Sequence, residues 1–171
     1  MATRRFIKGQ PEELAAHIKS LGRGLVVFDG RPGSGKTYLA DDMARRIGCK
    51  STDADRDFLD HDKGTFIGAL RLDEMQRSLT DSLARSPLIL FSTVCARQAI
   101  ELARLSAAAF IWVEQMSLMF VHEAERHFEY DDLRWPLGID PLHDEVETYI
   151  SAYDARNRLD QFVYVNAYEG S

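Results

Sequence analysis

One stretch of eight residues has the composition and spacing of a phosphate-binding loop. Residues 30–37 read Gly-Arg-Pro-Gly-Ser-Gly-Lys-Thr and match the pattern G-x-x-x-x-G-K-[ST]. In this pattern backbone N–H groups converge on an anion, the lysine reaches the β- and γ-phosphates, and the last hydroxyl holds Mg²⁺. We therefore expect a nucleoside-triphosphate site built from all eight residues: Gly30, Arg31, Pro32, Gly33, Ser34, Gly35, Lys36 and Thr37.

A second group of residues that could do chemistry is acidic. The run Asp53-Ala54-Asp55-Arg56-Asp57 follows a weak, short strand predicted over residues 50–53. Carboxylates beside a triphosphate can order a Mg²⁺-bound water and hold or deprotonate an acceptor hydroxyl. A solvated turn whose acids cap a helix from Phe58 onward is the alternative, and the residues alone leave both open.

The elements that must position these groups alternate along the chain. Apolar runs predict buried strands over residues 25–29, 88–91, 108–113 and 162–165, besides the weaker one over 50–53. Helical spacing appears over 11–21, 37–47, 66–83 (one helix or two abutting ones), 97–105, 116–128 and 141–153. Alternation of this kind predicts an α/β fold, a three-layer sandwich around a five-stranded parallel sheet.

Bulk properties limit the classes of protein. The 171 residues are 45% hydrophobic and 28% charged, which predicts one globular domain over residues 1–171. A net charge of −6 makes nucleic acid an unlikely partner. Cys49 and Cys95 lie far apart, the N-terminus does not resemble a signal peptide, and no apolar run reaches the roughly 18 residues of a membrane span. We therefore expect a cytoplasmic protein with free thiols.

The chain resembles the P-loop kinases of small molecules and nucleotides. Besides residues 30–37, the segments 64–66, 69–71 and 87–95 look most like uridine-kinase-like proteins, and the order of elements is shared with shikimate and adenylate kinases. A GTPase is disfavoured, because the nearest approach to the guanine-reading N-K-x-D motif is residues 166–169, Asn-Ala-Tyr-Glu. The resemblance implies strand order 2-3-1-4-5, the cofactors ATP and Mg²⁺, and transfer of the γ-phosphoryl group to a small hydroxylated or phosphorylated metabolite.

Several further residues receive roles only through this resemblance. Asp53 and Asp55 are similar to the D-x-D of shikimate-type kinases, which implies that they act with Lys36 in catalysis and that Asp53 shares the metal with Thr37. The lid of such kinases would fall around residues 127–139. Arg126 directly precedes this segment and Arg134 lies within it, and both are candidates for the cation on the transferring phosphoryl group, although ordinary surface arginines explain them equally well.

One position departs from the kinase pattern. Most kinases of this class carry an acidic residue at the end of the third strand, and Ser92 stands there instead. Asp53 could take over its metal role, whereas Asp29, directly before the loop, is the less favoured substitute. An ATP-binding switch or scaffold without useful turnover therefore remains open beside the kinase. So does a kinase of nucleosides, nucleotides or nucleic-acid ends.

Overall fold

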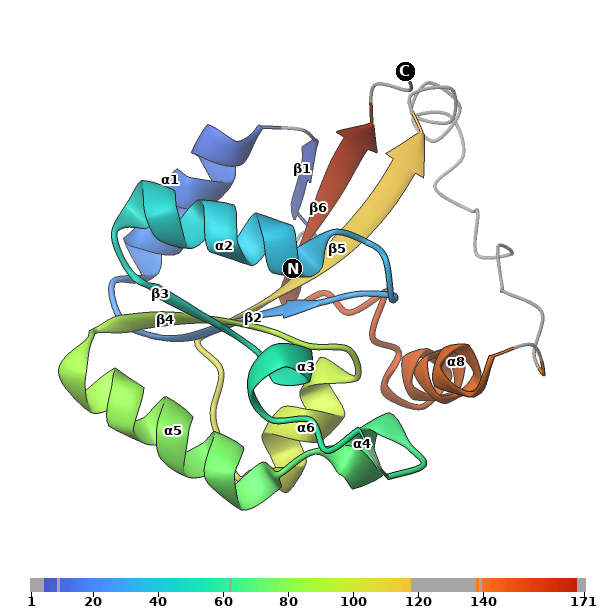
Figure 1. Ribbon diagram of the computed structural model, residues 1–171. Helices are drawn as coiled ribbons and strands as arrows, with labels where there is room; N and C mark the ends of the chain where they lie inside the picture. The colour runs from blue at the N-terminus through green and yellow to red at the C-terminus, as the bar shows by residue number, and fades with distance from the viewer. Residues whose placement is uncertain (1–4, 9, 62, 118–137, 139, 169–171) are drawn as a thin grey trace.

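A parallel six-stranded sheet between two layers of helices forms the body of the protein (Figure 1). The computed structural model describes residues 5–8, 10–61, 63–117, 138 and 140–168. The strands are β1 (Arg5–Lys8), β2 (Gly24–Asp29), β3 (Lys50–Asp53), β4 (Leu88–Ser92), β5 (Ala109–Ser117) and β6 (Gln161–Tyr168). All neighbouring pairs are parallel, and their order across the sheet is β1-β6-β5-β2-β4-β3.

Helices follow most of these strands. They are α1 (Pro11–Leu21), α2 (Lys36–Ile47), α3 (Ala54–Asp57), α4 (Phe66–Ala69), α5 (Leu72–Arg85), α6 (Ala96–Leu102) and α8 (Pro141–Tyr153). In the part of the chain that the structure describes, none of these helices is both long and apolar enough to cross a bilayer.

The strands contribute side chains to two separate apolar cores, because successive side chains of a strand point to opposite faces of the sheet. Val26 and Phe28 of β2 belong to the core on the face of the sheet that α1 and α2 cover. Leu25 and Val27 of the same strand pack with the face covered by α5 and α6, to which α8 also contributes. β2 is therefore buried on both sides, which explains its continuous apolar run.

The predicted sheet order is confirmed. Counted from the strand before the phosphate loop, the five expected strands lie in the order 2-3-1-4-5. A sixth strand, β1, was not predicted and extends the sheet beyond β6. Over residues 66–83 the structure has two abutting helices, α4 and α5. The helix expected over residues 116–128 is wrong at residues 116–117, which belong to β5, and the rest of that range lies outside the described residues.

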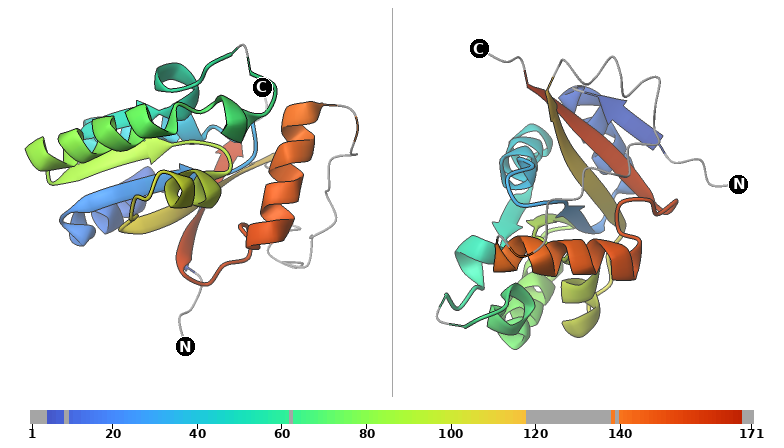
Figure 2. Two further views of the ribbon diagram at one scale, coloured as in Figure 1. Left: turned by 90° about the horizontal axis from the view of Figure 1, so that it is seen from below. Right: turned by 90° about the vertical axis from the view of Figure 1, so that its right-hand side faces the viewer.

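The order of the strands places the phosphate loop at the middle of the sheet. β2 lies between β4 and β5, and the loop leaves its carboxyl end. Viewed from that end, α8 crosses in front of the sheet (Figure 2). The residues that leave the ends of β2, β3 and β4 therefore meet beside α8, as expected for the ligand site of an open parallel sheet.

Candidate functional site

The phosphate loop has the backbone shape that its sequence predicts. Gly33 and Gly35 have φ angles of +77° and +82°, which lie in the left-handed region that favours glycine. A Cβ on Gly35 would also come within 2.9 Å of the Asn166 amide nitrogen. The Ser34 hydroxyl is buried and has no hydrogen-bond partner within the part of the chain that the structure describes. A buried hydroxyl in the loop, together with the N-terminus of α2, suits an anion such as a phosphate.

Lys36 opens α2 and folds back over the loop. Its ammonium donates to the carbonyl oxygen of Arg31 at 3.2 Å, and only 8% of the residue is exposed. Burial lowers the pKa of this ammonium, whereas Asp29, Asp55 and Asp53 act in the opposite direction. A desolvated cation that is held by one neutral carbonyl is available to a negatively charged ligand.

Three side chains from separate elements meet at the N-terminal end of α2. The Thr37 hydroxyl donates to Asp53 Oδ2 at 2.7 Å, and the Ser92 hydroxyl donates to the same oxygen at 2.5 Å. Asp53 and Ser92 are register partners on β3 and β4. A carboxylate from the neighbouring strand thus lies directly against position 92. One carboxylate and a hydroxyl beside a triphosphate are a donor set that suits Mg²⁺, which keeps several of its waters in proteins.

Both oxygens of the Asp53 carboxylate accept hydrogen bonds. Its Oδ1 accepts a hydrogen bond from Arg56 N at 3.1 Å and so caps α3, while Oδ2 faces Thr37. Asp55 lies on the first turn of α3 and is exposed. Partial loss of solvent and the nearby Asp53 carboxylate raise its pKa, and Lys36 opposes the rise. A carboxylate of raised pKa is a stronger base than an ordinary aspartate.

Three contacts with the loop were not predicted from the sequence. Asp29 is 1% exposed, and its Oδ1 accepts from Gly30 N at 2.8 Å. Arg31 forms a two-pronged ion pair with Glu147 of α8, at 2.6 and 3.2 Å. Asn166 of β6 donates to the carbonyl oxygen of Ser34 at 3.0 Å. The loop is thereby held from β2, α8 and β6, by residues whose local sequence has no recognisable motif.

Another contact fixes α8 to the segment on the far side of the site. The Glu145 carboxylate accepts from the backbone N–H groups of Phe66 and Ile67, at 2.6 and 2.9 Å. These amides begin α4, where a carboxylate is favoured by the unpaired N–H groups of the first turn. α8 therefore contacts both the phosphate loop, through Glu147, and α4, through Glu145.

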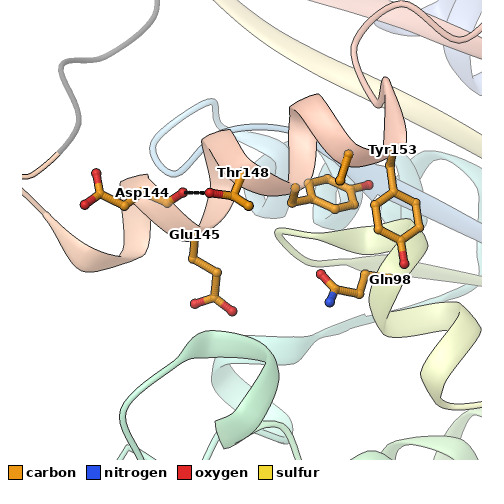
Figure 3. A pocket seen from close by; sticks show the side chains of 7 residues that line it. Gln98, Asp144, Glu145, Thr148 and Tyr153 are labelled. Atoms are coloured by element: carbon orange, nitrogen blue, oxygen red, sulfur yellow. Dashed lines mark hydrogen bonds between the residues drawn. The ribbon is translucent and has the colours of Figure 1, made fainter.

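A cavity of about 330 Å³ lies along α8 (Figure 3). Its walls come from α8 and α6 and consist of Gln98, Asp144, Glu145, Thr148, Tyr149, Ala152 and Tyr153. Asp144 and Glu145 project from the start of α8, whereas Tyr153 lies at the other end, near Gln98 (Figure 3). The phosphate loop contributes no residue to this lining.

The structure brings together four of the expected site residues, and others lie outside the part of the chain that it describes. Lys36, Thr37, Asp53 and Asp55 gather at the carboxyl ends of β2 and β3. Arg126, Arg134 and nearly all of the expected lid at 127–139 lie outside the described residues. Cys49 and Cys95 are free thiols.

Comparison with known proteins shows the fold and nothing finer. No family model matches the chain, and no curated protein matches its sequence. Among solved structures, it is similar to a possible uridine kinase from Bacillus stearothermophilus, with 13% sequence identity and a TM-score of 0.57. The similarity covers 90% of this chain and 97% of the other. The chain therefore has the fold of P-loop kinases.

Proposed function

We propose that the protein binds ATP with Mg²⁺ and transfers the γ-phosphoryl group to a small hydroxylated or phosphorylated metabolite. The observation that carries the proposal is the meeting of Thr37, Asp53 and Ser92 beside Lys36. A loop that only binds phosphate needs no carboxylate at this place, whereas phosphoryl transfer requires a metal opposite the lysine. The buried Ser34 hydroxyl, which has no partner among the described residues, and the left-handed glycines of the loop support an anionic ligand.

Each residue has a distinct task in this proposal. Lys36 and the loop N–H groups stabilise negative charge on the phosphates, and Thr37 with Asp53 would hold the metal. Bound Mg·ATP supplies the phosphoryl group and neutralises the charge that develops on it. Asp55 would orient the acceptor hydroxyl and accept its proton, a role that its raised pKa supports.

A binding module without useful turnover is the second candidate. Ser92 favours it, because the acid that most kinases of this class carry at this position is absent. The two candidates differ in what Asp53 does. In a kinase this carboxylate stabilises the metal-bound transition state, whereas in a binding module it only helps to hold Mg·ATP and caps α3 through Oδ1.

The test combines nucleotide binding with phosphoryl transfer. Thermal shifts with ATP and Mg²⁺ establish binding, and ADP release is then followed with a panel of hydroxylated metabolites. The panel begins with nucleosides, because the similar structure is described as a possible uridine kinase. Lys36→Ala should abolish transfer, since the ammonium stabilises developing charge in a water-poor site, an effect worth several kcal/mol.

Lys50→Ala provides the matched control, because Lys50 carries the same charge and is exposed on β3. We expect it to retain wild-type transfer. Wild-type turnover in Lys36→Ala would refute the proposed mechanism. Tight Mg·ATP binding with no transfer to any acceptor would establish the binding module instead.

A further inference from the structure

The hydroxyl of Tyr149 reaches from α8 into the base of the phosphate loop. It donates a hydrogen bond to Asp29 Oδ2, and both residues are at most 2% exposed. The other oxygen of that carboxylate accepts from Gly30 N at 2.8 Å and, more weakly, from Ala96 N at 3.4 Å. Tyr149, Asp29 and the first residue of the loop therefore form a continuous chain of hydrogen bonds.

The chemistry of this position requires a phenol and not only an aromatic ring. The Tyr149 oxygen also accepts a hydrogen bond from Arg97 N at 3.1 Å, so its donor and an acceptor site are both used. A phenylalanine would fill the same volume but would leave the buried Asp29 oxygen and the Arg97 amide without this partner. Unpaired buried polar groups are costly, so the environment selects the hydroxyl.

We propose that Tyr149 is a positioning residue for the phosphate loop and acts through Asp29. Its hydroxyl fixes the carboxylate in the orientation in which Oδ1 holds the Gly30 amide, and this sets where the loop begins. Tyr149 itself contacts no nucleotide in this role. The inference rests on the proposed function only for its effect on nucleotide affinity, because the shape of the loop can be measured without a ligand.

Protonation of Asp29 gives this role a distinctive signature. Burial raises the pKa of Asp29 to about 6, while the hydrogen bonds from Tyr149, Gly30 and Ala96 and the charge of Lys36 act to lower it. The charged and titratable groups that face it are Lys36 from α2, Cys95 ahead of α6 and Tyr149 from α8. Since the Tyr149 hydrogen bond stabilises the charged carboxylate, its removal moves the pKa of Asp29 further upward.

Tyr149→Phe tests the proposal, with Tyr153→Phe as the matched control. Tyr153 also lines the α8 cavity, but its hydroxyl donates to Glu101, away from the loop. Hydrogen exchange of residues 30–37 is measured in the ligand-free protein from about pH 5 to pH 8, spanning the pKa of Asp29. Mg·ATP affinity is measured on the same samples.

We expect faster loop exchange in Tyr149→Phe and about tenfold weaker Mg·ATP binding, as for the loss of a charged hydrogen bond. The pH midpoint of loop protection should rise, whereas Tyr153→Phe should match the wild type in every measurement. Equal loop exchange and an equal midpoint in both variants would overturn the inference. Absence of ATP binding by the wild type would refute the proposed function, and the exchange data would still decide the inference.

A double-mutant cycle keeps the test decisive if Tyr149→Phe folds poorly. Asp29→Asn is made alone and together with Tyr149→Phe, and the rate of loop exchange is compared among the four proteins. Because Tyr149 acts through Asp29, the second substitution should add little to the first. Fully additive effects would show that the two residues act on the loop independently and would overturn the proposal.

Discussion

Replacing Asp53 by asparagine should weaken metal binding more than nucleotide binding. The substitution keeps the size of the side chain but removes the charge that Oδ2 presents to Thr37 and Ser92, at 2.7 and 2.5 Å. Those hydroxyls can rotate and remain paired with an amide, so we expect the protein to stay folded. The change therefore acts on the charge of the site more than on its packing.

The expected magnitude follows from the charge removed. Two unit charges 4 Å apart interact by about 1 kcal/mol in water and about 4 kcal/mol near a protein surface, and a divalent ion doubles both values. The doubled value for water is about 2 kcal/mol, and a loss of this size should raise the Mg²⁺ concentration for half-maximal activity about 30-fold. Affinity for ATP without metal should be unchanged or slightly tighter, because a negative charge near the phosphates is lost.

The assay is isothermal titration with ATP in EDTA and at a series of Mg²⁺ concentrations, together with the Mg²⁺ dependence of ADP release. Asp81→Asn removes the same charge from an exposed position on α5 and serves as the control. If ATP affinity fell equally with and without Mg²⁺, Asp53 would be only the cap of α3. An Mg²⁺ midpoint that matches the Asp81→Asn control would refute the metal assignment.

Three further outcomes follow from the same contacts. Because the pKa of Asp29 is raised from 3.8 to about 6, the folded state binds its proton more tightly than the unfolded state. In urea denaturation, the free energy of unfolding of the wild type should therefore fall by about 3 kcal/mol relative to that of Asp29→Asn as the pH rises from about 4 to 6. A difference between the two free energies that does not change with pH would contradict this. Glu145→Gln should lower the free energy of unfolding by about 1–3 kcal/mol, because a charged acceptor for two α4 amides is lost, while Asp73→Asn on α5 should change it little. Ser92→Asp should place a second carboxylate against Asp53 and so lower the melting temperature in EDTA. Adding Mg²⁺ should raise the melting temperature of this variant by more than it raises that of the wild type. An equal rise in both proteins would argue against a metal at this place.

The sheet could largely be predicted because its signals are local. β2 and β4 are continuous apolar runs, and a strand buried on both faces leaves that pattern in its own sequence. β1 has only four residues and a single neighbour, β6, which lies more than 150 residues further along the chain. Its existence depends on that pairing more than on its own composition, so the sequence offered no comparable signal.

The site, too, combines residues that a local motif predicts with residues that only the fold brings together. Gly33, Lys36 and Thr37 belong to one contiguous motif whose geometry is encoded by its own residues. That Asp53 lies against Ser92 could not be read from the sequence, because it depends on the register of β3 against β4. Tyr149 contacts Asp29, directly before the loop, across 120 residues of sequence, and Asn166 contacts Ser34 in the loop across 132, and no local spacing predicts such contacts.

The pairing of β1 with β6 has a consequence for how the protein acquires its binding site. Arg5 is the register partner of Phe162, so the sheet is completed by strands from opposite ends of the described chain. Contacts of such long sequence separation form slowly, because the loop between them must be closed first. Asn166, which holds the Ser34 carbonyl, belongs to the same late strand. During synthesis on the ribosome, the phosphate loop therefore gains this support only after β6 has emerged and docked.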